Sequence, residues 1–119
     1  MGDINLRYKK THQDAIVPAY AKPGDSGADL YAVDDYLIPP QGTVKVETGI
    51  AFEIPQGFEI QIRLRSSVAM HTTLVMPNAP ATIDSGYRGS VGIILFNAGT
   101  KYAVVVKKGE RIAQAVLCP

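Results

Sequence analysis

The sequence has no tryptophan, one cysteine and almost no excess of charge of either sign. Its 12 basic and 11 acidic residues leave a formal net charge of +1. A protein whose main partner is a nucleic acid or an acidic membrane carries a larger positive excess. We therefore expect any bound polyanion to be small and held by a local site. Because Cys118 has no second cysteine to pair with, we expect a reducing, cytoplasmic location.

Long apolar runs are missing as well. The sequence contains neither a stretch of about 18 apolar residues nor a basic and then apolar leader, so no spanning helix or signal is expected. The two histidines, His12 and His71, lie far apart in sequence, and we expect both on the surface and no zinc site. A chain of 119 residues fits one domain, so we expect residues 1–119 to form a single one.

The sequence does contain short strand-like segments separated by turns. Apolar and polar residues alternate in 43–47 and 58–64, and 102–106 and 112–116 are rich in β-branched residues. Residues 90–96 are almost all apolar, which predicts a strand buried on both faces. Glycine and proline mark turns between these segments, and the one short helix is expected at Ser67–Met70. The pattern predicts an all-β domain, either a sandwich or a partly closed barrel.

Two segments in the first half place polar groups where a strand begins or ends. Residues 22–30 form a glycine-rich turn that leads into a strand at Asp29. Asp29 is either a turn acceptor or a carboxylate at the mouth of a site, and the residues alone favour the turn. Arg65, Ser66 and Ser67 follow an alternating strand and could hold phosphate oxygens, although a solvated strand end has the same composition.

Two further segments combine polar side chains with apolar strands. Asn78 can both donate to and accept from the edge of a base, Asp84 is a candidate general base for water, and Tyr87 offers a flat face to a sugar. The alternative makes them a loop residue, an Asx-turn residue and a core aromatic, but leaves their clustering accidental. Gln114, alone among apolar residues in 109–116, either faces solvent or reaches a ligand.

The four segments occur in the order of four motifs of the trimeric dUTPase family and resemble them. They are GDSGADL (24–30), RSSVA (65–69), residues 78–89 with IDSGYRG, and GERIAQ (109–114). The resemblance extends from about Pro18 to Val116. It implies a distorted β jelly roll of the β-clip type that forms homotrimers, with active sites between subunits. It also implies Mg²⁺-assisted, in-line attack of water at the α-phosphorus of dUTP, which gives dUMP and pyrophosphate.

The resemblance implies roles for individual residues. Asp84 would hold the attacking water, and Tyr87 would stack on the deoxyribose and exclude a 2′-hydroxyl. The uracil edge would be read by Asn78 and by backbone groups at Thr82, Ile83 and Gly92. The phosphates would be held by Arg65, Ser66, Ser67 and Gln114. Asp29 would meet the magnesium ion through water, in keeping with a cation that retains several waters and binds mainly through phosphates.

The segments depart from the family pattern at three places. Ser67 stands where the second motif usually has glycine, and Leu64 where a proline usually precedes Arg65. The given sequence ends at Pro119, whereas the family carries a fifth motif, a glycine-rich tail with an arginine. We therefore expect residues 1–119 alone to bind dUTP with Mg²⁺ but to hydrolyse it slowly.

Three alternatives to a dUTP hydrolase differ in how well they fit the residues. A dCTP deaminase-like enzyme shares the RSS sequence, but it needs a carboxylate in the strand after the third motif, and Ser90–Asn97 has none. A non-catalytic, regulatory nucleotide binder agrees with the missing tail but not with an intact Asp84, Tyr87 and Gln114. A purely structural β module ranks last, because it gives the polar segments no role.

Overall fold

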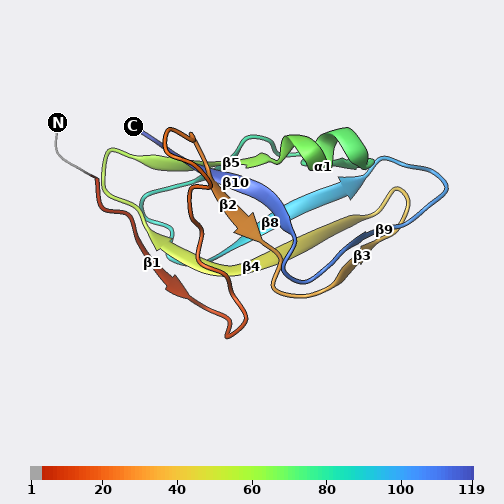
Figure 1. Ribbon diagram of the computed structural model, residues 1–119, viewed down its shortest axis with the longest axis horizontal. Coiled ribbons are helices and arrows are strands. Elements are labelled where there is room, and N and C mark those ends of the chain that lie inside the picture. The colour runs from red at the N-terminus through yellow and green to blue at the C-terminus, as the bar shows by residue number, and fades with distance from the viewer. Residues whose placement is uncertain (1–3) are drawn as a thin grey trace.

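The computed structural model describes residues 4–119 and shows a protein built almost entirely of β-strands (Figure 1). The predicted all-β class is therefore confirmed. In chain order the elements are β1 (Arg7–Lys10), β2 (Ala28–Tyr31), β3 (Tyr36–Ile38), β4 (Thr43–Glu53), β5 (Glu59–Leu64), α1 (Ser66–His71), β6 (Leu74–Val75), β7 (Ala81–Ile83), β8 (Ser90–Asn97), β9 (Val104–Val106) and β10 (Arg111–Cys118).

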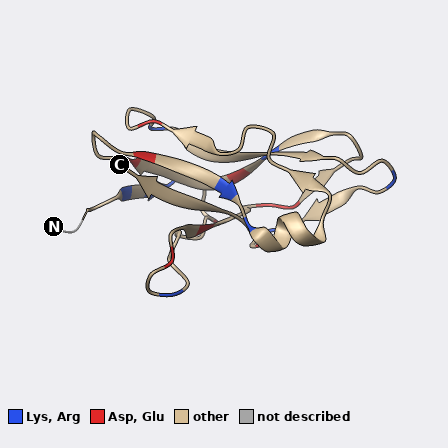
Figure 2. Cartoon of the chain, turned by 90° about the horizontal axis from the view of Figure 1, so that it is seen from above, with Lys and Arg blue, Asp and Glu red and all other residues tan. Residues whose placement is uncertain are grey.

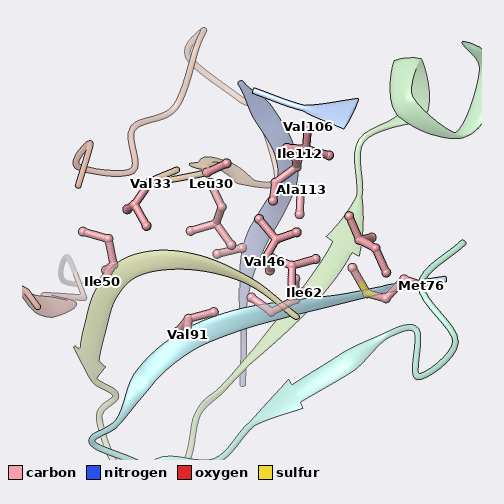
Figure 3. Packing of buried hydrophobic residues seen from close by; sticks show 14 of the residues in the cluster. Leu30, Val33, Val46, Ile50, Ile62, Met76, Val91, Val106, Ile112 and Ala113 are labelled. Carbon is pink, nitrogen blue, oxygen red and sulfur yellow. The ribbon is translucent and has the colours of Figure 1, made fainter. Parts of the chain in front are cut away.

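Two antiparallel four-stranded sheets enclose the core. One has the strand order β1-β4-β8-β6, the other has the order β2-β10-β5-β7, and β3 pairs with β9 in a small third sheet. The inward-facing residues pack together, so that Val46 and Val91 from the first sheet meet Leu30, Ile62 and Ala113 from the second (Figure 3). The crossed strand order brings segments far apart in sequence into contact, so that the first, second and fourth motif segments line one cavity.

Two predicted elements are longer in the structure than in the sequence analysis. The strand expected at 43–47 continues to Glu53 as β4, through Gly49 with a φ of 67°. A Cβ on Gly49 would lie 2.8 Å from His12 Cβ and 2.9 Å from Ala15 Cβ, so both the backbone angle and the close approach require glycine. The helix predicted at Ser67–Met70 is present and extends by one residue at each end, as α1.

The prediction that 90–96 is buried on both faces is wrong. In β8, Val91, Ile93 and Leu95 are buried, but Gly92 is only half-buried and Ile94 is 36% exposed. The reason is that β8 belongs to an antiparallel sheet with one face toward the core and the other facing outward. The outward face of β8 is therefore free to line a cavity.

Asn97, at the end of β8, is a buried polar residue that ties several elements together. Its Nδ2 donates to Ile38 O (3.1 Å) and Tyr102 O (3.0 Å), and its Oδ1 accepts from Gly99 N (2.9 Å) and from the Thr73 hydroxyl. These partners lie in β3, the β8–β9 loop and the loop after α1. Tyr102 itself is 79% exposed, and the strand predicted at 102–106 begins only at Val104.

The two histidines lie on the surface, as predicted. Within residues 4–119, no group of three or more histidine, cysteine, aspartate or glutamate side chains is arranged to hold a metal ion. No helix in this range is long and apolar enough to cross a membrane. Basic and acidic residues occur on several separate segments along the molecule (Figure 2).

Candidate active site

Five of the predicted site residues line one cavity of about 190 Å³ between β7, the turn after it and the outward face of β8. They are Thr82, Ile83, Asp84, Tyr87 and Gly92. The cavity is completed by Lys45, Ser90, Val91 and Ile94. The fold thus brings together the Asp84 carboxylate and the Tyr87 ring, which the residues alone grouped, and the strand backbone that the resemblance implied. We call this space the hairpin cavity.

Asp84 presents a carboxylate that no other group of the described chain engages. Its backbone oxygen closes the turn by accepting from Tyr87 N at 3.0 Å. No hydrogen bond or ion pair within residues 4–119 involves its side-chain oxygens, and the residue is exposed. The Asx-turn alternative is therefore wrong for Asp84. A free carboxylate at a cavity wall can accept a proton from a water molecule.

Tyr87 is held at the cavity by its hydroxyl and by a glycine. The hydroxyl donates to Ser90 O at 3.0 Å, and a Cβ on Gly89 would lie only 2.7 Å from the ring's Cζ. The ring can occupy this position because Gly89 has no side chain. Tyr87 is 44% exposed, so it is not the core aromatic of the alternative interpretation. Its ring is thus a fixed, accessible wall against which a sugar could stack.

Four other predicted residues line a second cavity of about 450 Å³ at the β2–β10–β5 surface: Asp29, Arg65, Ser66 and Gln114. Sheet pairing explains the arrangement, because Gln114 of β10 lies opposite both Asp29 of β2 and Arg63 of β5. Arg65 directly follows β5 and, in an extended conformation, immediately precedes α1. A Cβ on Gly27 would overlap the Gln114 side chain, so the glycine-rich turn packs against Gln114. We call this space the arginine cavity.

Asp29 is the electrostatic centre of the arginine cavity. Its side chain is 16% exposed, with Oδ1 3.7 Å from Arg65 Nε and Oδ2 3.4 Å from Arg111 Nη1. Asp25 is the turn acceptor instead, because its Oδ2 accepts from Lys22 N at 2.9 Å. The turn interpretation that the residues alone favoured for Asp29 is therefore wrong. Three cationic and two anionic side chains line the cavity, which leaves a local excess of positive charge suited to phosphate oxygens.

Arg111 was missed by the sequence analysis and lines the arginine cavity with Gln114. Strict alternation would put these two residues, three apart, on opposite faces of β10. The pairing of β10 with β2 shifts register between Arg111 and Ala113, so a bulge at Ile112 returns Arg111 to the face of Gln114. Consistent with this bulge, the successive residues Ile112 and Ala113 are both buried. A bulge leaves no clear signal in a single sequence.

Two predicted residues lie outside both cavities. Asn78 is exposed in the loop between β6 and β7, and Ser67 is exposed in the first turn of α1. The sequence analysis also gave no role to Lys45, which lines the hairpin cavity. The hairpin cavity and the arginine cavity share no residue. The predicted site is therefore present as two separate halves in one chain.

The fold and the two cavities define a class, an all-β protein of two packed sheets with two separate polar cavities. Within that class the chain belongs to the dUTPase family, whose model matches residues 13–119. It is similar to the deoxyuridine 5′-triphosphate nucleotidohydrolase of Picosynechococcus sp., with 46% identity over 98% of this chain and 81% of that protein. The protein of the same name from Hydrogenobaculum sp. is 48% identical, with the same coverage.

Solved structures show the same fold. The dUTPase of Staphylococcus bacteriophage 80alpha has a TM-score of 0.88 and 27% identity, over 97% of this chain and 90% of that chain. A variant of that enzyme, solved with dUpNHpp, has a TM-score of 0.88 at 26% identity and the same coverage. A variant of the phage phi11 dUTPase, described with a structural Mg(II) ion, has a TM-score of 0.89 over 98% of this chain and 91% of that chain, and at 23% identity it shows the fold alone.

Proposed function

We propose that this chain hydrolyses dUTP to dUMP and pyrophosphate. Family membership supports the reaction, since the similar curated proteins are named for it. The observation in this chain that carries the proposal is the hairpin cavity, where the uncommitted Asp84 carboxylate lies beside the fixed ring of Tyr87. A structural β module would need neither a free carboxylate nor an exposed aromatic ring at this place.

Backbone groups in the hairpin cavity are suited to reading a base. β7 is an edge strand of its sheet, so Thr82 and Ile83 present backbone groups that no neighbouring strand pairs on one side. β8 is paired with β6 only at Phe96 and Asn97, so its edge at Gly92 is also open. A uracil between these two edges would receive strand-like hydrogen bonds from both. We keep Asn78 as a proposed contact to the base edge, although it lies outside the cavity in one chain.

The chemical step that we propose uses Asp84 as the general base. Its carboxylate would accept a proton from water as the water oxygen attacks the α-phosphorus in line, and pyrophosphate would leave. Tyr87 would stack on the deoxyribose, and its fixed ring would leave no room for a 2′-hydroxyl. These assignments agree with the exposure of both side chains and with the absence of a competing partner for the Asp84 carboxylate in residues 4–119.

The arginine cavity would hold the phosphates. Arg65, Ser66 and Gln114 supply donors there, and we add Arg111 because it lines the same space. Ser67 remains a proposed contact from the adjacent turn of α1. Mg²⁺ fits a place where the Asp29 carboxylate offers hard oxygen atoms beside phosphate-binding groups. Bound through water to Asp29 and directly to the phosphates, the ion would neutralise charge on the triphosphate.

The separation of the two cavities supports a homotrimer. A nucleotide carries its base and its phosphates on one small molecule. The side chains that we propose to bind the base and those that we propose to bind the phosphates line two cavities that share no residue. If a second copy of the chain brings its arginine cavity to the hairpin cavity of the first, the site is complete. We therefore propose a homotrimer with sites between subunits and no nucleic acid or membrane partner. We also propose an intracellular location, since the single cysteine has no intramolecular disulfide to maintain.

The proposed function is tested by assaying pyrophosphate release and dUMP formation from dUTP with Mg²⁺, and by repeating the assay with dCTP, dTTP and UTP. We expect kcat/KM for dUTP to exceed the others by about 100-fold or more, because each excluded group or lost hydrogen bond costs several kcal/mol. Equal rates with UTP would contradict the assignment of Tyr87. Conversion of dCTP to dUTP would identify a deaminase instead.

A further inference from the structure

Lys45 lies against the place where we propose that the base is read. It projects from the outward face of β4, opposite Ile94 of β8, and lines the hairpin cavity with Asp84. A Cβ built on Gly92 would lie 2.9 Å from Lys45 Cγ. The methylene arm of Lys45 therefore packs over the Gly92 backbone, in the space that a side chain at position 92 would fill. Lys45 is thus a wall of the cavity and not only a surface charge.

Glu47 holds the Lys45 ammonium in this position. Lys45 Nζ lies 3.2 Å from Glu47 Oε1, and Glu47 is paired with Gly92 across the β4–β8 ladder. The two side chains are 60% and 38% exposed, so the ammonium has access to the cavity contents and to water. An ammonium carries three N–H groups, and one directed at Glu47 leaves two for other acceptors. Glu47, and not Asp84, is the ion-pair partner of Lys45 among the described residues.

We infer that Lys45 helps select the base: its ammonium donates a hydrogen bond to the exocyclic oxygen at position 4 of uracil. This inference rests on the proposed function, which places the base between β7 and Gly92. The chemistry gives the selectivity. Lysine offers donors and no acceptor, so it matches a carbonyl oxygen and opposes the amino group that cytosine carries at the same position. Backbone groups can read the remaining edge of the base, while Lys45 reads this one atom.

The test compares Lys45→Met with the unmodified chain, because methionine keeps an unbranched arm over Gly92 and removes the donors. A hydrogen bond from a charged group contributes about 1.5–3 kcal/mol, which corresponds to about a 10- to 100-fold change. We expect the ratio of kcat/KM for dUTP to that for dCTP to fall by at least about tenfold. The loss should appear mainly as a higher KM for dUTP, because the contact is made to the base in the bound substrate.

Two further variants separate selectivity from structure. Lys45→Arg retains donors and should retain most of the dUTP preference. Lys101→Met, which removes an exposed lysine in the β8–β9 loop, is the matched control and should change nothing. Calorimetry with dUMP and dCMP supplies a readout that does not depend on turnover. The dUMP preference should fall in Lys45→Met by the same factor as the kinetic ratio.

Three results would overturn the inference. One is an unchanged dUTP/dCTP ratio in Lys45→Met. Another is a fall in kcat with no change in the ratio, which would make Lys45 part of the chemical step. The last is dissociation of the oligomer in Lys45→Met by light scattering, which would make Lys45 an interface residue. If the unmodified chain fails to hydrolyse dUTP, the proposed function fails instead, and the comparison of dUMP with dCMP binding still decides the role of Lys45.

Discussion

At the scale of single residues, the Asp84 carboxylate is exposed and unengaged within the described chain, although it lies in a tight turn. This position leaves the carboxylate available for the role of general base that we propose. In Asp84→Asn, we expect nucleotide binding to be kept and kcat to fall about 10²–10⁴-fold, because an amide cannot take the proton. Calorimetry with a non-hydrolysable dUTP analogue and a turnover assay measure the two effects separately. Turnover at the parent rate would show that Asp84 serves only the turn.

The second prediction concerns Tyr87, whose ring and hydroxyl make different contacts. The hydroxyl bonds to Ser90 O, whereas the ring forms the cavity wall. Tyr87→Phe keeps the wall and should keep the preference for dUTP over UTP. Tyr87→Ala removes the wall, and we expect that preference to fall at least about tenfold. The ratio of kcat/KM values measures this, and an unchanged ratio in Tyr87→Ala would place ribose exclusion elsewhere.

A third prediction concerns the ion pair between Asp14 and Lys108, whose Oδ2 and Nζ atoms are 2.9 Å apart. The hydrogen bond from Lys108 is the main cause that lowers the pKa of Asp14 below its ordinary value of 3.8. A lowered carboxylate pKa gives a stabilising contribution that is present above the ordinary pKa and is lost as pH falls through the folded-state value. NMR titration should show a pKa below 3.8 for Asp14, and Lys108→Met should return it toward that value.

At the scale of elements, alternation in the sequence located β5 and the start of β4, and apolar or β-branched composition located β8 and β10. Alternation did not predict the strands correctly where local backbone geometry interrupts the two-residue period. The continuation of β4 depends on a positive φ at Gly49, and the position of Arg111 depends on the bulge at Ile112. Neither event changes the composition of its strand, so a single sequence carries no sign of them. The burial of β8 was misjudged because its outward apolar residues line a cavity and not a second core.

The buried side chain of Asn97 connects several elements by hydrogen bonds, so we expect its truncation to lower the free energy of unfolding. Asn97→Ala would leave the carbonyls of Ile38 and Tyr102 and the amide of Gly99 without their present partner. An unsatisfied buried polar group costs about 1–3 kcal/mol, so we expect the free energy of unfolding to fall by about 3 kcal/mol or more.

Denaturant unfolding measures the effect of Asn97→Ala. Thr100→Ala, an exposed position in the β8–β9 loop, is the control and should change stability by less than about 0.5 kcal/mol. If the free energy of unfolding of Asn97→Ala changed as little as that of the control, water would have replaced the hydrogen bonds of the lost side chain.

At the scale of the whole molecule, the residues alone did not predict two separate cavities, whereas the family resemblance implied sites between subunits. The family resemblance grouped Asp84 with Tyr87 and Arg65 with Gln114, and each pair lines one cavity in the structure. The separation of the two groups depends on the order of strands in the sheets, which spacing along the chain does not encode. The exposure of Asn78 and Ser67 depends on the same three-dimensional arrangement.

The division of the site predicts the oligomeric state. We expect light scattering at micromolar concentration to give the mass of a homotrimer, about three times the chain mass of 12.8 kDa. A stable monomer that hydrolyses dUTP would contradict the proposal, since one chain would then join the two cavities without a partner.

A mixing experiment tests directly whether sites form between chains. Asp84→Asn removes the carboxylate that we propose as the general base, and Arg65→Ala removes a cation of the arginine cavity, so each variant alone should be nearly inactive. In trimers reassembled from equal amounts of both, a site between subunits has an intact Asp84 from one chain and an intact Arg65 from its neighbour in about a quarter of cases. We therefore expect mixing to restore about a quarter of the parent activity. If both halves came from the same chain, every site would carry one of the two defects, and mixing would restore nothing.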